Sequence, residues 1–252
     1  MSSRLGATLA ACWIVIACSS GTDRPATAPD PALPSTPIRI LVLTATRGFR
    51  HDSIAAAREV LTTMAASSRE FAVTATEEVS SITAAALANY DVLCFVLTTG
   101  ELPFDSEARR AIVNFVSEGK GFIGIHSAAD TLYEWPDYGR LVGAYFKEHP
   151  WTQPATVLVA DRSHPSTAGL EERFTVTEEF YTFRENPRTA RILLRLDPSS
   201  VNASGDFPLA WAQAFGAGRT YYNALGHFDA TWRDARFQRQ LADALRWAGR
   251  RS

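Results

Sequence analysis

The sequence has few cysteines, few histidines and no run of like charge. Its 252 residues include three Cys and five His, and 25 basic residues nearly balance 27 acidic ones, for a net charge of -2. A nucleic-acid-binding protein needs a basic footprint for phosphates, so this balance argues against nucleic acid as a partner. Hydrophobic residues make up 46% and charged residues 21%, which is typical of a globular chain.

The N-terminal segment differs from the rest in composition. Arg4 is followed by the uncharged run LGATLAACWIVIA, which is shorter than the ~20 apolar residues that span a bilayer. It fits the apolar part of a secretory signal, and it ends in a lipobox-like Val-Ile-Ala before Cys18. We therefore predict a signal peptide at 1–17 and lipidation of Cys18. The alternative is an ordinary signal cleaved elsewhere, with Cys18 incidental.

Residues 18–37 are predicted to be the lipid anchor and a linker, because 19–37 contains five Pro and three Ser. The chain would then be an exported lipoprotein on the periplasmic or cell-surface side, attached to a membrane only through its anchor. Cys12 would leave with the signal, so no disulfide is possible in the mature chain. Cys94 lies in the apolar run VLCFVL and is predicted to be an inert core residue.

The first half of the folded part, 38–252, alternates predicted strands and helices. Fully apolar strands in such an alternation indicate a parallel sheet covered on both faces. The expected fold class is α/β, flavodoxin-like and doubly wound, with a mostly parallel sheet and an irregular β-rich second half. Strands are predicted at 38–43, 71–76, 92–97, 122–126, 156–159, 174–177, 190–196, 209–215 and 220–224, and helices at 53–66, 82–88, 106–118 and 234–248.

Three loops should converge on one side of this sheet. Ligands of open parallel sheets bind beyond the carboxyl ends of the strands. The loops after the first, third and fourth strands carry His51, Glu101 and His126, respectively. We expect these side chains to line one crevice, with His51 and His126 within roughly 10 Å of each other, the scale of a ligand pocket.

The five histidines all lie in predicted loops, at 51, 126, 149, 164 and 227, which favours a shared site over a scattered surface distribution. Neutral imidazole is both a metal ligand and a general base near neutral pH. His51, His126 and His149 are candidate ligands of a divalent metal ion. No helical ligand motif is present, so distant segments would have to assemble such a site.

Two further features point to the same site. Glu178 and Glu179 are adjacent in a predicted strand, so only one of them can face it; alternatively both are solvated. Aromatic residues such as Tyr133 and Trp135 are concentrated between 133 and 151, and amphipathic rings suit a carbohydrate. The alternative for these rings is packing over the core.

The turn after the fourth strand reads Gly-Ile-His126-Ser-Ala, with no Cys and without the spacing of a hydrolase nucleophile elbow. A glutamine amidotransferase is therefore disfavoured.

Many separate motifs resemble the ThuA-like (trehalose-utilisation) family, in the expected order from Ile38 to Trp247. They include GFRHDS at 48–53, GFIGIHSAADT at 121–131, EEFY at 178–181, GRTYYN at 218–223 and LGH at 225–227. The resemblance implies a class I glutamine-amidotransferase-like fold without the amidotransferase Cys. It also implies a link to trehalose and related disaccharides, in a pathway with sugar oxidoreductases as possible partners. Glu178 and Phe180 depart mildly from the family, which often has Asp and Trp there.

The resulting hypothesis is a hydrolase, lyase or isomerase acting on keto-disaccharides or glycosides through acid–base chemistry that a divalent metal could assist. The rival is a non-catalytic carbohydrate-binding lipoprotein. The predicted catalytic residues are His126, His51 and Glu179. The predicted substrate-binding residues are Arg50, Glu101, Asp130, Tyr133, Trp135, His149, Tyr181 and His227.

Overall fold

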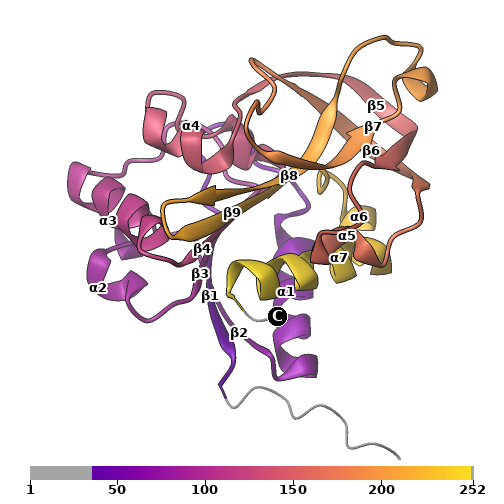
Figure 1. The fold of residues 1–252 in the computed structure, drawn as a ribbon. Helices are drawn as coiled ribbons and strands as arrows, with labels where there is room; N and C mark the ends of the chain where they lie inside the picture. The colour runs from indigo at the N-terminus through magenta and orange to yellow at the C-terminus, as the bar shows by residue number, and fades with distance from the viewer. Residues whose placement is uncertain (1–35, 251–252) are drawn as a thin grey trace, which may run out of the picture. The chain divides into compact units, whose positions relative to one another are not determined.

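The computed structural model describes residues 36–250, and within them the strands form one nine-stranded sheet in the order β2-β1-β3-β4-β9-β8-β7-β5-β6 (Figure 1). The predicted signal peptide, Cys18 and most of the predicted linker lie outside these residues. Among the described helices, none is both long and apolar enough to cross a membrane.

One half of the sheet is parallel. It pairs β2 (Phe71–Thr76) with β1 (Ile38–Leu43), then β3 (Val92–Val96), β4 (Gly121–Ile125) and β9 (Gly218–Asn223). Every residue of β3 and β4 is buried, as expected for strands covered on both faces. The predicted neighbourhood of β1, β3 and β4 is confirmed.

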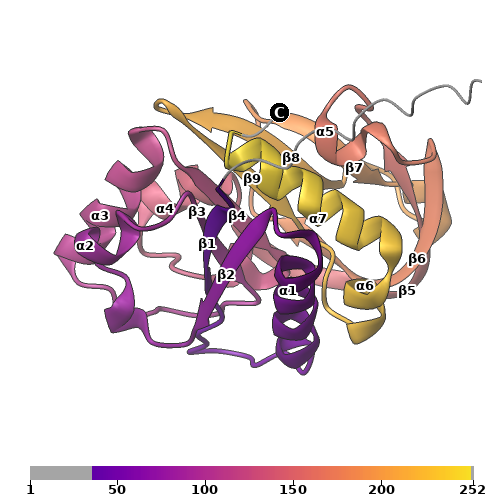
Figure 2. The same ribbon diagram turned by 90° about the horizontal axis from the view of Figure 1, so that it is seen from below.

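Helices cover both faces of this half (Figure 2). On one face lie α1 (Ile54–Ser68), α6 (Asp229–Arg233) and α7 (Ala235–Ala248), and on the other lie α2 (Ala84–Leu87), α3 (Ser106–Ser117) and α4 (Pro136–Val142). Short 3-10 turns at Val79–Ser81, His126–Asp130 and Pro198–Val201, and the short α5 (Pro165–Ala168), complete the helical elements of the described chain. The predicted doubly wound α/β class is confirmed.

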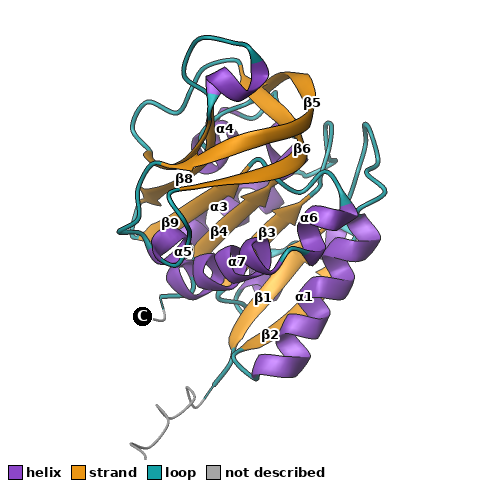
Figure 3. Ribbon diagram, turned by 90° about the vertical axis from the view of Figure 1, so that its right-hand side faces the viewer, coloured by secondary structure: helices purple, strands orange, loops and turns teal. Residues whose placement is uncertain are grey.

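The other half of the sheet is antiparallel. The hairpin of β8 (Pro208–Phe215) with β9 reverses the strand direction, and β7 (Arg191–Leu196), β5 (Phe146–Val159) and β6 (Arg173–Phe183) follow (Figure 3). Phe215 pairs with Gly218 across the turn, and Gly216 takes a left-handed φ of 58° there, so the predicted hairpin is confirmed.

Several predicted element bounds were wrong. β5 begins ten residues before the predicted 156. Its first part is mostly exposed and contains two register irregularities, so its sequence lacks the alternation that predicts a strand. β6 continues six residues past the predicted 177. Helix α1 begins at Ile54 without a side-chain cap; the hydroxyl of Ser53 instead donates to the Gly226 carbonyl. The segment predicted as one helix at 82–88 contains only the short α2, preceded by a 3-10 turn at Val79–Ser81.

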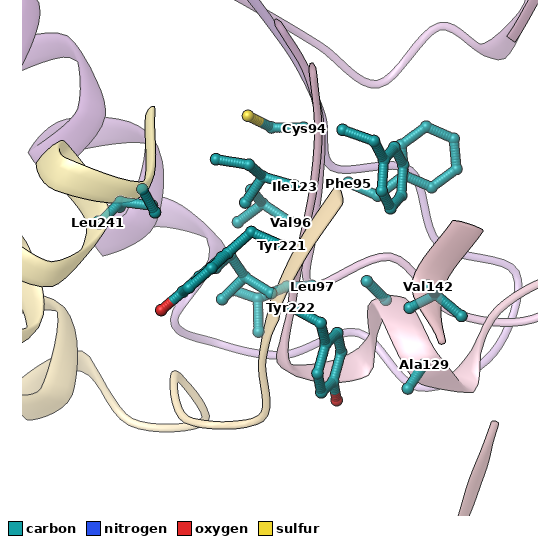
Figure 4. Packing of buried hydrophobic residues seen from close by; sticks show 14 of the residues in the cluster. Cys94, Phe95, Val96, Leu97, Ile123, Ala129, Val142, Tyr221, Tyr222 and Leu241 are labelled. Atoms are coloured by element: carbon teal, nitrogen blue, oxygen red, sulfur yellow. The ribbon is translucent and has the colours of Figure 1, made fainter. Parts of the chain in front are cut away.

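Cys94 lies in the core between β3 and α7. Its side chain points to the same side of the sheet as Ile123 and Leu241 (Figure 4). The residue is 1% exposed, and burial raises the pKa of its thiol well above the ordinary value. The predicted core position is confirmed, and a thiol held neutral in an apolar core is a poor nucleophile.

Candidate functional site

Three imidazoles and one carboxylate meet at the carboxyl edge of the parallel strands. One side-chain ligand atom from each of His51, His126, Glu179 and His227 lies within 4.8 Å of the others. The ring centroids of His51 and His126 are 4.8 Å apart, and His227 lies 5.2 and 5.4 Å from them, respectively. The predicted approach of His51 to His126 is confirmed. We call these four residues the His/Glu cluster.

Glu179 connects the histidines. Its Oε2 lies 3.5 Å from Nε2 of His126 and 3.2 Å from Nδ1 of His227, while its Oε1 lies 3.3 Å from Nδ1 of His149. Burial opposes ionisation of the carboxyl, but the neighbouring His126 and His227 imidazoles outweigh it and hold its pKa well below the usual range. The cluster therefore contains a carboxylate.

His126 occupies the turn after β4 with a left-handed φ of 52°. Its carbonyl accepts from Tyr222, and its Nδ1 lies 2.7 Å from the Ala224 carbonyl, which can only accept. Nδ1 must therefore carry a proton, and Nε2 faces Glu179 with no hydrogen-bond partner. A lone pair directed at a carboxylate is repulsive, and a metal ion bound between the two groups would relieve this repulsion.

His51 is buried at the end of the loop after β1. Its Nδ1 lies 3.4 Å from the Ser127 hydroxyl. Burial, reinforced by the neighbouring His126 and His227, lowers the pKa of His51 to about 3. A neutral imidazole is the form that binds metals.

His227 follows β9 and is held by Glu178. The fully buried Glu178 carboxylate accepts from the backbone N–H groups of Gly226 at 2.9 Å and His227 at 3.2 Å, and from the Thr231 hydroxyl at 2.5 Å. The Glu179 carboxylate, whose Oε2 lies 3.2 Å from Nδ1 of His227, raises the pKa of His227. As predicted, only one of the two adjacent glutamates faces the cluster. The alternative that both are solvated is wrong.

The side chains of His149 and Tyr181 flank the cluster. That of His149 is half-exposed, whereas Tyr181 is 3% exposed, with its ring centroid 4.3 Å from that of His126. Tyr181 therefore packs against His126 and offers no open face to a ligand.

A second polar group lies nearby. The Tyr133 hydroxyl donates to Asp130 at 2.6 Å, and the Arg184 guanidinium sits 4.1 Å from the centre of the Tyr133 ring. Burial raises the pKa of Asp130, although the hydrogen bond from Tyr133 opposes the shift. Asp130 ends the same 3-10 turn that begins at His126.

Other predicted residues lie apart from the cluster or turn away from it. Trp135 is 6% exposed and stacks on Tyr138, so it packs in the core as the alternative held. Glu101 is exposed, with its carboxylate accepting from the Glu134 amide. His164 does not join the other four histidines: it caps α5 and packs against Tyr221 and Trp247. Arg50 forms a bidentate ion pair with Glu77.

The candidate metal ligands also differ from those expected. His149 contacts only the outer oxygen of Glu179, whereas Glu179 and His227 complete the set with His51 and His126. The sequence could not distinguish His149 from His227, because both were predicted to lie in loops, whereas His149 lies in β5, and their distances depend on pairings in the second half of the sheet. Three imidazoles and one carboxylate are a donor set that suits zinc and similar divalent cations.

Comparison with known proteins decides the family. Residues 39–248 match the ThuA family, whose description is trehalose utilisation. The chain belongs to the ThuA family. Its role therefore lies in trehalose utilisation in a general sense. No curated protein matches the chain.

Solved structures agree with a ThuA fold. A candidate ThuA-like protein from Bacteroides uniformis is 25% identical with a TM-score of 0.75, covering 88% of this chain and 95% of that one. Another, from Parabacteroides merdae, is 21% identical with a TM-score of 0.70, covering 85% and 90%. A cytoplasmic protein from Salmonella typhimurium is 10% identical with a TM-score of 0.59, covering 84% and 98%, and shares the fold alone.

Proposed function

We propose that this ThuA domain is a metal-assisted enzyme acting on keto-disaccharides or related oxidised glycosides. The observation that carries the proposal is the convergence of His51, His126, His227 and Glu179, from four separate segments, on one point. A non-catalytic binding protein has no need to gather three imidazoles around a carboxylate. Perturbed ionisable groups gathered in this way are characteristic of catalytic sites.

The cluster residues would hold the cation. The Nδ1 proton of His126 is directed to the Ala224 carbonyl, which orients Nε2 toward the shared centre as outer hydrogen bonds do in metal sites. A cation bound there would stabilise negative charge on a substrate carbonyl oxygen.

His149 is the best-placed general base. Its side chain is half-exposed, whereas His126 is fully buried, so a substrate can reach His149. Donation from Nδ1 of His149 to Oε1 of Glu179 would leave Nε2 free to take a proton from the carbon beside the keto group. His126, which the sequence offered both as a catalytic residue and as a metal ligand, becomes a ligand in this assignment, and His149 becomes the base.

The decisive test is Glu179→Gln, which keeps the shape of the side chain and removes its charge. We expect the purified variant to lose the divalent metal found by elemental analysis and to turn over 3-keto disaccharides about 10²–10⁴-fold more slowly. Glu172→Gln is the control, because Glu172 is an exposed residue just before β6. Wild-type metal content and turnover in Glu179→Gln would refute the proposal.

We further propose that the chain is exported and anchored through Cys18, and that a sugar oxidoreductase supplies its oxidised substrate. The apolar run before Cys18 supports the first part. The second part is supported by the proposed reaction, because proton abstraction by His149 requires a keto group beside the reacting carbon. Cys18→Ala should move the protein from the membrane to the soluble or precursor fraction, and unchanged membrane partition would refute the anchor.

A further inference from the structure

Phe49 is the one large hydrophobic side chain that is exposed among residues 36–250, at 64%. It directly precedes Arg50 and His51 in the loop after β1. Its ring centroid lies 4.8 Å from that of His51, in an edge-to-face arrangement. An aromatic ring left open to solvent beside a polar cluster offers a face on which an apolar face of a ligand can stack.

The loop that presents Phe49 is held in place by Thr99. The backbone N–H of Arg47 donates to the Thr99 carbonyl at 2.8 Å, the N–H of Gly48 donates to the Thr99 hydroxyl at 3.2 Å, and that hydroxyl donates to the Phe49 carbonyl at 2.8 Å. Gly100, with φ of 73°, allows this approach, because a Cβ there would lie 2.9 Å from the backbone of Arg47 and Gly48. The ring is therefore presented by a fixed segment.

The surface around Arg50, the residue after Phe49, is hollowed and polar. One pocket is lined by Arg50, His51, Asp52, Ile54, Ala55, Arg58 and Glu77, and a second shares Arg50 and Glu77 and adds Arg47 and Glu78, among others. Arg50 and Glu77 pair at 2.8 and 3.0 Å. Their charges compensate each other, so the pair offers donors and acceptors to a neutral ligand rather than a net charge to an anion.

An aromatic face beside paired donors and acceptors matches the chemistry of a pyranose ring, which has apolar C–H faces and a rim of hydroxyls. We propose that Phe49 stacks on the unreacted ring of a disaccharide, whose other ring reaches the His/Glu cluster past His51. The position of the reacting ring rests on the proposed function, whereas the stacking contact does not. Phe49 is thus a residue that selects disaccharides over monosaccharides.

The test measures binding without turnover. Trehalose, which is not oxidised, is titrated calorimetrically into the detergent-solubilised full chain, with glucose as the comparison. We expect trehalose to bind more tightly than glucose, and Phe49→Ala to weaken trehalose binding about tenfold, while Phe49→Trp restores it. Phe49→Leu keeps apolar area without an aromatic face and should resemble Phe49→Ala.

Three results would overturn the proposal: wild type that binds no trehalose, Phe49→Ala that binds as wild type does, or Phe49→Leu that fully restores binding. Because Phe49 is exposed, melting curves should show all three variants folded. The metal and turnover measurements on Glu179→Gln separate the two proposals, and Glu172→Gln, at an exposed residue outside the cluster, should bind trehalose as wild type does. If Glu179→Gln keeps its metal and turnover while Phe49→Ala loses binding, the metal-enzyme proposal falls and the stacking proposal stands.

Discussion

The two halves of the sheet differ in strand direction and burial, and they contribute different groups to the cluster. The central strands β3 and β4 of the parallel half are buried along their whole length, and the loops of this half supply His51, His126 and, after β9, His227. The antiparallel half has long, half-exposed strands, and it supplies Glu179 to the cluster, while His149 only flanks it. The parallel edge therefore provides imidazoles, and the antiparallel strands provide the charge that holds them together.

The junction between the halves is the β8–β9 hairpin, and breaking it should have the largest effect. A Cβ on Gly218 would lie 1.9 Å from the Val116 carbonyl oxygen and 2.4 Å from that of Lys120, both of them backbone atoms. Gly218→Ala should therefore destabilise the protein by more than about 4 kcal/mol or prevent its folding. The yield of soluble protein and its melting temperature are the measurements.

Gly169→Ala is the matched control, because its Cβ would meet only the Arg239 side chain, at 3.6 Å. Its melting temperature should stay near that of wild type. Equal melting temperatures for the Gly218 and Gly169 variants would show that the junction tolerates side chains and that the halves are less tightly joined than the contacts indicate.

Glu178→Gln tests whether the antiparallel half positions His227. The carboxylate accepts hydrogen bonds on both oxygens, including one from Glu179 N at 3.0 Å. The amide of glutamine keeps only one acceptor oxygen, and its NH2 group cannot accept the hydrogen bonds made to the other. We expect a loss of about 2–3 kcal/mol in unfolding free energy and metal affinity weakened about 10–100-fold. A variant that loses stability but binds metal as tightly as wild type would limit Glu178 to a structural role.

Cys94→Ala tests the parallel half away from the cluster. Removing one buried sulfur should cost about 1–2 kcal/mol and leave turnover unchanged, since Cys94 lies in the apolar core. Chemical denaturation and steady-state turnover are the measurements. A folded variant without activity would make Cys94 a candidate nucleophile after all.

His164→Asn should have the smallest effect at neutral pH. Burial lowers the pKa of His164 to about 4, so the unfolded chain, with its ordinary value of 6.5, binds the proton first. The contribution of His164 to stability is thus complete above about pH 6.5 and is lost as pH falls toward 4. Asn keeps an acceptor for the Ser166 amide that His164 now caps, and it does not titrate.

The melting temperature of His164→Asn should therefore fall less than that of wild type between pH 6.5 and 4. Parallel pH profiles for both proteins would show that the acid sensitivity has another source.

The degree of burial explains both why the sequence predicted the parallel half and why it missed the start of the antiparallel half. Uniform burial makes β1 and β3 read as apolar runs, and topology then brings His51 to His126. The first part of β5 carries irregular register and mostly exposed residues, so its composition resembles a loop. The position of Glu179 depends on that pairing, and the exchange of His149 for His227 among the candidate ligands follows from it.

The backbone of His126 has a consequence for mutational selection. A left-handed conformation costs a non-glycine residue about 1–3 kcal/mol, and Gly or Asn adopts it more readily. A library randomised at this position and sorted for folding alone should therefore enrich Gly and Asn, whereas sorting for turnover should return His. The difference in enrichment between the two sorts would measure how much folding stability is lost by placing an imidazole at this turn.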